Sequence, residues 1–298
     1  MKYRALKNTG LQISEIAFGC MSMDLTRKDN DELIHAAIDG GINYFDTADL
    51  YNQGKNEEAL GQALKNKRSE VIVASKVGNQ LRSDGSGWDW NPSKDYILKA
   101  VDQSLKRLQT DYIDIYQLHG GTMEDPMSEA IEAFEQLIAE GKIRNYGTSS
   151  IRPNVIREYV ANSNIASVMM QYSLLDRRPE EQMLDLFESN KVGVMVRGGL
   201  AKGLLAGKSP EAYLNYKSEE IELLVNEMKK YTDDKTKLSN VALQWILSHS
   251  AVTAAVVGIR TKKQLNEALT YSESTFIERS ELDDLGKILP PAQYQAHR

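Results

Sequence analysis

The stretch that decides the fold is NYFDTADLY, residues 43–51. It begins as a short apolar strand and breaks into a loop that carries an acid, Asp46, and a phenol, Tyr51. Two further apolar runs end in the same way, because residues 71–76 stop at Lys76 and residues 113–119 stop at His119. If these runs are neighbouring parallel strands, their polar ends meet at one edge of the sheet and form an enzyme site.

The same alternation of strand and helix patterns runs along the whole chain. The expected strands are 16–20, 44–46, 71–76, 113–119, 143–148, 168–171, 192–196 and 254–257. The expected helices are 29–39, 56–66, 93–108, 126–140, 153–161, 180–190, 219–231, 239–248, 261–271 and 280–289. Ahead of them, residues 2–13 flank the turn signal Asn8-Thr9-Gly10, which predicts a β-hairpin.

Eight strand-helix units in 298 residues are the number that closes a barrel. The alternative is an open doubly wound sheet, but polar residues end at least five strands, which is more than its one switch point needs. No linker rich in Pro, Gly or Ser divides the chain. We therefore expect an α/β protein, a (β/α)8 TIM barrel with an N-terminal β-hairpin and extra helices, as a single domain over residues 1–298.

Composition excludes several classes of protein. The net charge is −6 and no dense Lys/Arg cluster is present, so we expect no nucleic-acid partner. No apolar run approaches the ~20 residues of a membrane span, and no signal peptide is evident. The single cysteine, Cys20, allows no intrachain disulfide, so we expect a cytoplasmic protein. No metal is expected, because no metal-ligand spacing joins the histidines, which are His35, His119, His249 and His297.

Asp46, Tyr51, Lys76 and His119 together suit proton transfer to a carbonyl oxygen. A phenol with a pKa of ~10 is a poor acid at neutral pH, but a nearby ammonium such as Lys76 lowers that pKa. Asp46 would keep Lys76 charged, and His119 would direct a substrate oxygen toward Tyr51. Taken singly, each side chain has an ordinary structural explanation. Four such side chains at one rim of the barrel favour a catalytic site.

The segments NYFDTADLY, VIVASK, DYIDIYQLH, EGKIRNYGTSS, QYSLLDR and GLLAGK, in this order and spacing, closely resemble the aldo-keto reductases. The resemblance covers essentially the whole chain. It implies a (β/α)8 barrel that binds NADPH without a Rossmann domain, in keeping with the absence of a Gly-x-Gly-x-x-Gly motif. It also implies reduction of aldehydes or ketones by hydride transfer from the nicotinamide, with Tyr51 as the proton donor.

The resemblance further implies a set of cofactor contacts. Ser149 and Gln171 correspond to residues that bind the nicotinamide carboxamide. The segment with Arg197, Gly198, Leu200 and Lys202 corresponds to the one that crosses the pyrophosphate. The adenosine and 2′-phosphate site corresponds to Gly258, Arg260, Thr261, Gln264 and Glu267. A helix start with free N–H groups and the charge of Arg260 suit a phosphate, which favours NADPH over NADH.

Two departures from the family pattern affect the pocket. Arg197 stands where many members have a tyrosine that stacks on the nicotinamide, and we expect its planar guanidinium to stack instead. Gly120 follows His119 where a bulky residue is common, so the pocket is expected to be wider.

Apolar and aromatic residues on the rim loops suit a small or aromatic carbonyl substrate. These are Met21, Leu50, Trp88 and Trp90. Trp88 and Trp90 belong to the expected loop 78–92, and the alternative is that they only pack that loop. Two other functions remain open. Lys76 could form a Schiff base, as in barrel aldolases, or the chain could be a non-catalytic NADPH-binding sensor or accessory subunit. The sequence carries no mark of oligomeric state.

Overall fold

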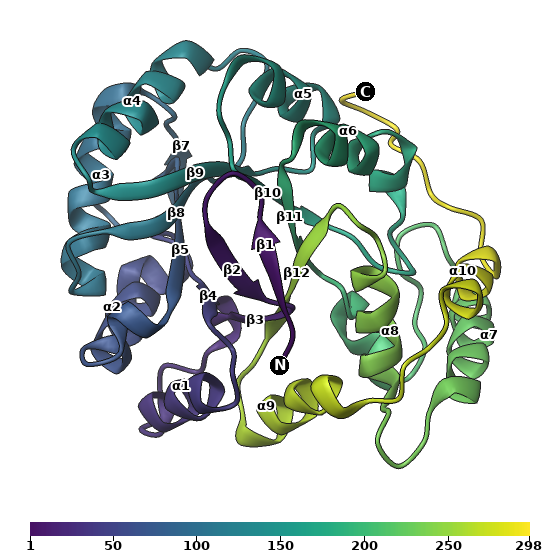
Figure 1. Ribbon diagram of the computed structural model, residues 1–298. Helices are drawn as coiled ribbons and strands as arrows, with labels where there is room; N and C mark the ends of the chain where they lie inside the picture. Colours follow the sequence, from purple (N-terminus) through teal and green to yellow (C-terminus); the bar gives the residue numbers. More distant parts are fainter.

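Eight parallel strands close into a barrel in the computed structural model, which describes residues 1–298 (Figure 1). The neighbour order is β10-β11-β12-β3-β4-β5-β8-β9, and closure is visible where the last strand pairs with the first, Gly258 opposite Gly19. The expected barrel is therefore confirmed. Its strands are β3 (Ile16–Gly19), β4 (Tyr44–Asp46), β5 (Ile72–Val77), β8 (Ile113–Leu118), β9 (Ile143–Ser149), β10 (Ser167–Gln171), β11 (Gly193–Arg197) and β12 (Val252–Gly258).

Helices surround the barrel (Figure 1). They are α1 (Asn30–Asp39), α2 (Lys55–Leu64), α3 (Lys94–Leu108), α4 (Met127–Ala139), α5 (Pro153–Asn162), α6 (Met183–Asn190), α7 (Ser218–Met228), α8 (Leu238–Leu247), α9 (Lys262–Leu269) and α10 (Arg279–Lys287). Helix α3 shows why they form. The Ser93 side chain caps its first turn, and Ile97, Val101 and Leu108 are buried on one face. A core of 68 buried residues fills the space between strands and helices.

A second, smaller core of 11 buried residues lies apart from the main one. The strands β1 (Tyr3–Leu6) and β2 (Leu11–Ser14) form the expected antiparallel hairpin, and it lies across the barrel in Figure 1. Leu6 and Ile13 of this hairpin join Tyr44, Ala74 and Ile115 of the barrel strands in the second core. The hairpin covers the amino-terminal end of the barrel. The carboxyl-terminal end therefore remains open for functional side chains.

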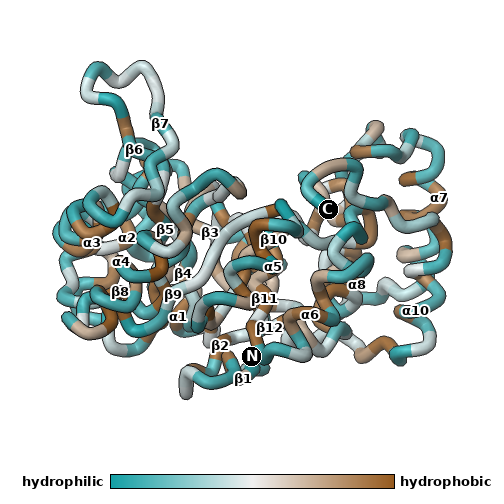
Figure 2. The backbone as a smooth tube through the Cα atoms, turned by 90° about the horizontal axis from the view of Figure 1, so that it is seen from above, coloured by the Kyte–Doolittle hydropathy of each residue, from teal (hydrophilic) through white to brown (hydrophobic).

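Residues 78–92, expected as a loop, contain a second hairpin. The strands β6 (Asn79–Leu81) and β7 (Trp88–Trp90) pair antiparallel, with Asn79 opposite Trp90. Figure 2 shows this hairpin projecting from the barrel on the side opposite β1 and β2. The expectation of a plain loop was therefore wrong. No helix in the structure has the length and apolar character needed to cross a membrane.

Candidate active site

Four polar side chains meet at the carboxyl-terminal end of the barrel. Lys76, near the end of β5, places Nζ at 2.8 and 2.7 Å from the two carboxylate oxygens of Asp46, the last residue of β4. The same ammonium donates to the backbone oxygen of Thr47 at 2.8 Å and to the hydroxyl of Tyr51 at 3.3 Å. The rings of His119 and Tyr51 pack in a T-shaped arrangement, with 5.8 Å between ring centroids. The structure thus brings together the four residues singled out from sequence.

Lys76 is held as an ammonium. Its side chain is fully buried, and burial lowers the pKa of a lysine because it disfavours the charged form. Attraction to Asp46 and Tyr51 acts in the opposite direction and prevails, so the pKa of Lys76 is raised. A permanent positive charge therefore lies beside the Tyr51 hydroxyl.

The pKa of Tyr51 departs from the expectation. Burial raises the pKa of the phenol, Lys76 lowers it, and the net direction is upward. The idea that Lys76 brings this pKa below its ordinary value is wrong for the structure, because desolvation is the larger effect. Tyr51 therefore carries its proton at neutral pH, as a proton donor must. Lys76 is placed to stabilise the phenolate once the proton has left.

His119 is a neutral imidazole at neutral pH. Burial, and then the charges of Lys76 and Arg197, lower the pKa of His119 to about 3. Its Nδ1 is buried and has no hydrogen-bond partner in the protein. A neutral imidazole has one N–H donor, so this ring can direct a substrate oxygen without competing for its proton.

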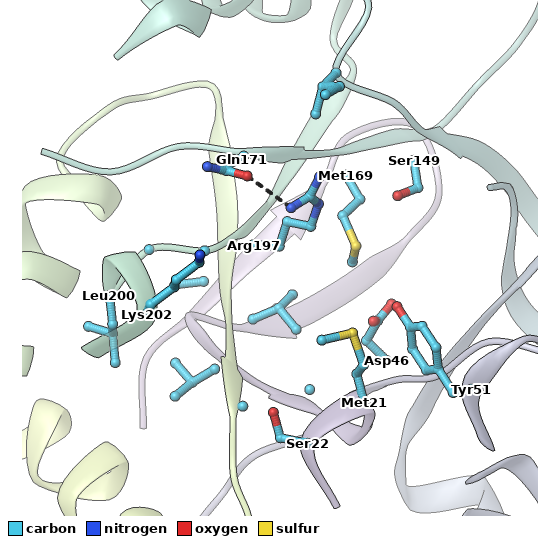
Figure 3. Close-up of a pocket in the computed structure, with 18 of the residues that line it drawn as sticks. Met21, Ser22, Asp46, Tyr51, Ser149, Met169, Gln171, Arg197, Leu200 and Lys202 are labelled. Carbon is cyan, nitrogen blue, oxygen red and sulfur yellow. Dashed lines mark hydrogen bonds between the residues drawn. The ribbon is translucent and has the colours of Figure 1, made fainter. Parts of the chain in front are cut away.

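A cavity of about 1310 Å³ opens beside this cluster. Figure 3 shows Asp46 and Tyr51 on one side and Gln171, Arg197 and Lys202 across from them. This volume exceeds the roughly 300–1,000 Å³ of an ordinary small-molecule pocket, so it has room for a cofactor and a substrate together. The predicted residues that line it are Met21, Asp46, Leu50, Tyr51, Trp88, Trp90, His119, Gly120, Ser149, Gln171, Arg197, Gly198, Leu200, Lys202, Gly258, Arg260, Gln264 and Glu267.

Two predicted residues lie outside this lining. Lys76 lies behind Tyr51 and acts through it. Thr261 is the N-cap of α9, where its hydroxyl accepts a hydrogen bond from the backbone N–H of Gln264 at 3.2 Å. Thr261 therefore shapes the helix start and does not line the cavity.

The amide of Gln171 is fixed from both sides. Its oxygen accepts from Arg197 at 3.1 Å, and its nitrogen donates to the hydroxyl of Tyr213 at 2.9 Å (Figure 3). Tyr213 also lies beside Lys202, with the ammonium 6.0 Å from the ring centroid. Sequence reasoning missed Tyr213, because it belongs to an irregular segment with no strand or helix pattern around it.

The start of α9 forms the far end of the cavity. The backbone N–H of Arg260 donates to the Gln264 side chain at 2.9 Å, and Glu267 accepts from Ser239 at 2.9 Å. These contacts hold Gln264 and Glu267 in place. Lys262 forms an ion pair with Glu32, whereas Arg260 lines the cavity and has no ion-pair partner. The helix start adds the positive end of the helix dipole. A phosphate is the ligand such a site suits.

Trp90 forms a wall of the cavity. Its ring lies against two glycines, since a Cβ added at Gly78 or Gly120 would meet the ring at 2.5 or 3.2 Å. Its indole N–H donates to Asp125 at 2.9 Å, which ties the β6–β7 hairpin to the loop after β8. Trp88 lines the same cavity but is 48% exposed. The two tryptophans therefore do more than pack their own loop.

A parallel barrel with an Asp, Tyr, Lys and His cluster beside a large cavity defines a class of barrel oxidoreductases that hold their cofactor without a Rossmann domain. The sequence model of the Aldo/keto reductase family matches residues 15–289, and the chain belongs to this family. It is accordingly an oxidoreductase that reduces carbonyl compounds by hydride transfer from a nicotinamide cofactor.

Individual relatives agree with this assignment. The chain is 45% identical to the "Uncharacterized oxidoreductase YqkF" of Bacillus subtilis, over 100% of both chains. It is 31% identical to the "Aldo-keto reductase YhdN" of the same organism, over 97% of this chain and 94% of the relative. Among solved structures, the holo form of aldo-keto reductase AKR11C1 from Bacillus halodurans is 47% identical, with a TM-score of 0.94 over 100% of this chain and 99% of that one.

Proposed function

We propose that this protein reduces an aldehyde or ketone to the alcohol with NADPH, and that Tyr51 donates the proton. The observation that carries the proposal is the contact of the Lys76 ammonium with both Asp46 and the Tyr51 hydroxyl at the wall of the large cavity. Such a contact lets a buried phenol release a proton, because the resulting phenolate has a fixed positive charge beside it.

The proposed roles follow from this geometry. The nicotinamide, when bound, supplies the hydride that the carbonyl carbon receives. As negative charge develops on the carbonyl oxygen, Tyr51 transfers its proton to that oxygen, and Lys76 stabilises the phenolate. His119 directs the oxygen with its single N–H, and Asp46 keeps Lys76 charged and in place.

The cofactor is proposed to lie along the cavity from the catalytic cluster to α9. Ser149 and Gln171 would bind the carboxamide, and Arg197 would stack its guanidinium on the nicotinamide. The pyrophosphate would run past Gly198, Leu200 and Lys202. Arg260 at the start of α9 supports NADPH over NADH, because its guanidinium is free to meet a 2′-phosphate.

The Schiff-base alternative is not favoured. A lysine that attacks a carbonyl must be neutral. The pKa of Lys76 is raised, and its ammonium donates to Asp46, Thr47 and Tyr51.

The substrate is a small molecule, and we propose a carbonyl compound with an apolar part that contacts Trp90. The cytoplasm is the proposed compartment, which the lone, buried Cys20 supports.

Replacing Tyr51 with phenylalanine tests the proposal. Tyr51→Phe keeps the ring but lacks the proton, so kcat for carbonyl reduction should fall by roughly the 10²–10⁴-fold that general acid catalysis contributes. The Kd of NADPH, measured by isothermal titration calorimetry, should stay within about twofold of the unsubstituted protein, since the phenol is not among the proposed cofactor contacts. Full activity in Tyr51→Phe would refute the proposed acid.

A further inference from the structure

The turn that carries Tyr51 has an unusual backbone. After Tyr51, Asn52 lies at φ 50° and ψ 36°, Gln53 at φ 56° and ψ 44°, and Gly54 at φ 85°. Three successive residues are therefore in the left-handed region, which residues other than glycine seldom adopt. A conformation of this kind persists only where the surrounding structure holds it.

Helix α2 begins directly after this turn, and its first residues are hydrogen-bonded to four other parts of the chain. Asn56 accepts from the Thr47 hydroxyl at 2.7 Å and donates to the backbone oxygen of Cys20 at 2.8 Å. Glu57 is fully buried and accepts from the Ser75 hydroxyl and from Nε of Arg107, the latter at 2.7 Å. Since Ser75 precedes Lys76 on β5, Glu57 links the strand that carries Lys76 to the helix that follows Tyr51.

Arg107, on α3, completes the support. Its side chain packs against Gly54, since a Cβ added to that glycine would be 2.7 Å from Cδ of Arg107 and 2.9 Å from Nε. Its Nη2 donates to Ser104 at 3.2 Å, so the guanidinium is held by its own helix as well as by Glu57. Arg107 does not line the cavity. It therefore acts on the turn from behind.

We propose that Arg107, oriented by Glu57, is a positioning residue that holds the Tyr51 hydroxyl within reach of Lys76. The inference rests on the proposed role of Tyr51 as proton donor. The hydroxyl is 3.3 Å from the ammonium, near the long limit of a hydrogen bond, so a small movement of the turn breaks the contact. The carboxylate of Glu57 accepts hydrogen bonds from both Ser75 and Arg107. It thereby fixes the position of the turn that carries Tyr51 relative to the strand that carries Lys76.

The test compares Arg107→Met with a matched ion pair elsewhere. Arg68 binds Asp114 at 2.7 Å and is also partly buried, but it lies ahead of β5, away from the cavity. Arg107→Met should lower kcat on the order of tenfold to a hundredfold, as expected when a catalytic group is displaced by about 1 Å. The Kd of NADPH should not change, and Arg107→Lys should recover part of the loss. Arg68→Met should leave kcat unchanged per folded molecule.

Each outcome bears on the inference separately from the proposed function. Unchanged kcat in Arg107→Met, or an equal loss in Arg68→Met, would overturn the positioning role. If Arg107→Met does not fold, Glu57→Gln takes its place, because it keeps the size and removes the charge. A normal kcat in Glu57→Gln would then overturn the inference. Tyr51→Phe is measured in parallel, and full activity there would instead refute the proposed acid on which the inference rests.

Discussion

Asp49 is a buried carboxyl with too few partners. It lies in the loop between Asp46 and Tyr51, is 6% exposed, and one carboxyl oxygen has no hydrogen-bond partner. Burial, and then the nearby charge of Glu57, raise the pKa of Asp49 to about 8, while Arg107 and Lys76 act in the opposite direction. The charge of Arg107 thus acts on two carboxyls, Asp49 and Glu57, but the arginine forms its ion pair with Glu57. Asp49 carries its proton at neutral pH, which leaves the arginine to Glu57.

Asp49→Asn should change how stability depends on pH. Between pH ~4, the ordinary pKa of an aspartate, and pH 8, Asp49 is protonated when folded and ionised when unfolded, so unfolding releases a proton and rising pH favours it. Relative to the variant, the protein should lose about 1.4 kcal/mol of unfolding free energy per pH unit in this window, and no more above it. Urea unfolding from pH 5 to 9 measures this. If the unfolding free energies of both proteins changed in parallel with pH, Asp49 would already be ionised in the folded protein at pH 5.

At the scale of single elements, we propose that the start of α9 decides the choice between NADPH and NADH. Arg260 lines the cavity, whereas Lys262, two residues later, donates to Glu32 at 2.8 Å and does not line it. The two cations therefore differ in what they can offer a phosphate, although they lie on the same helix start. Lys262 is a natural control for Arg260.

Arg260→Ala should weaken the binding of NADPH on the order of tenfold to a hundredfold, because a hydrogen bond to a charged group contributes about 1.5–3 kcal/mol. The affinity for NADH should change little, because NADH lacks the 2′-phosphate. Lys262→Ala should change neither Kd by more than about twofold, since an exposed ion pair contributes little. Equal losses of NADPH and NADH affinity in Arg260→Ala, measured by isothermal titration calorimetry, would rule out the proposed 2′-phosphate contact.

The elements also show what a sequence can predict. The strands β4, β5 and β8 were predicted because each is an apolar run with a polar end, and parallel pairing then requires Asp46, Lys76 and His119 to meet. The β6–β7 hairpin was missed because its two strands have only three residues each, too few to show a strand pattern, and a glycine-bearing turn joins them. The contact of Glu57 with Arg107 spans 50 residues between two helix faces, and no periodicity encodes such a pair.

At the scale of the molecule, the cavity draws on almost the whole chain. Its lining begins at Gly19, at the end of the first barrel strand, and extends to Ala268 on α9. A ligand that occupies it contacts residues of the first and the last barrel strand, β3 and β12, which pair with each other. We propose that residues 1–298 form one domain and that cofactor binding stabilises this domain as a unit.

NADPH should therefore raise the melting temperature of the whole protein. At about 100 times its Kd, a ligand that binds only the folded state adds about 2.7 kcal/mol, which for a chain of this size is a rise of about 4 °C. Differential scanning calorimetry should show a single unfolding transition, and NADPH should shift the whole of it to higher temperature. A transition that splits, with one part unaffected by NADPH, would contradict the single domain.

The positions of the tryptophans have a spectroscopic consequence. The chain has three, of which Trp88 and Trp90 line the cavity, while Trp245 is buried in the main core. Intrinsic fluorescence therefore combines two emitters that line the cavity with one that lies in the main core. Quenching by a ligand should remove the emission of the rim pair and spare that of Trp245, so the protein can signal occupancy of its cavity without any added label.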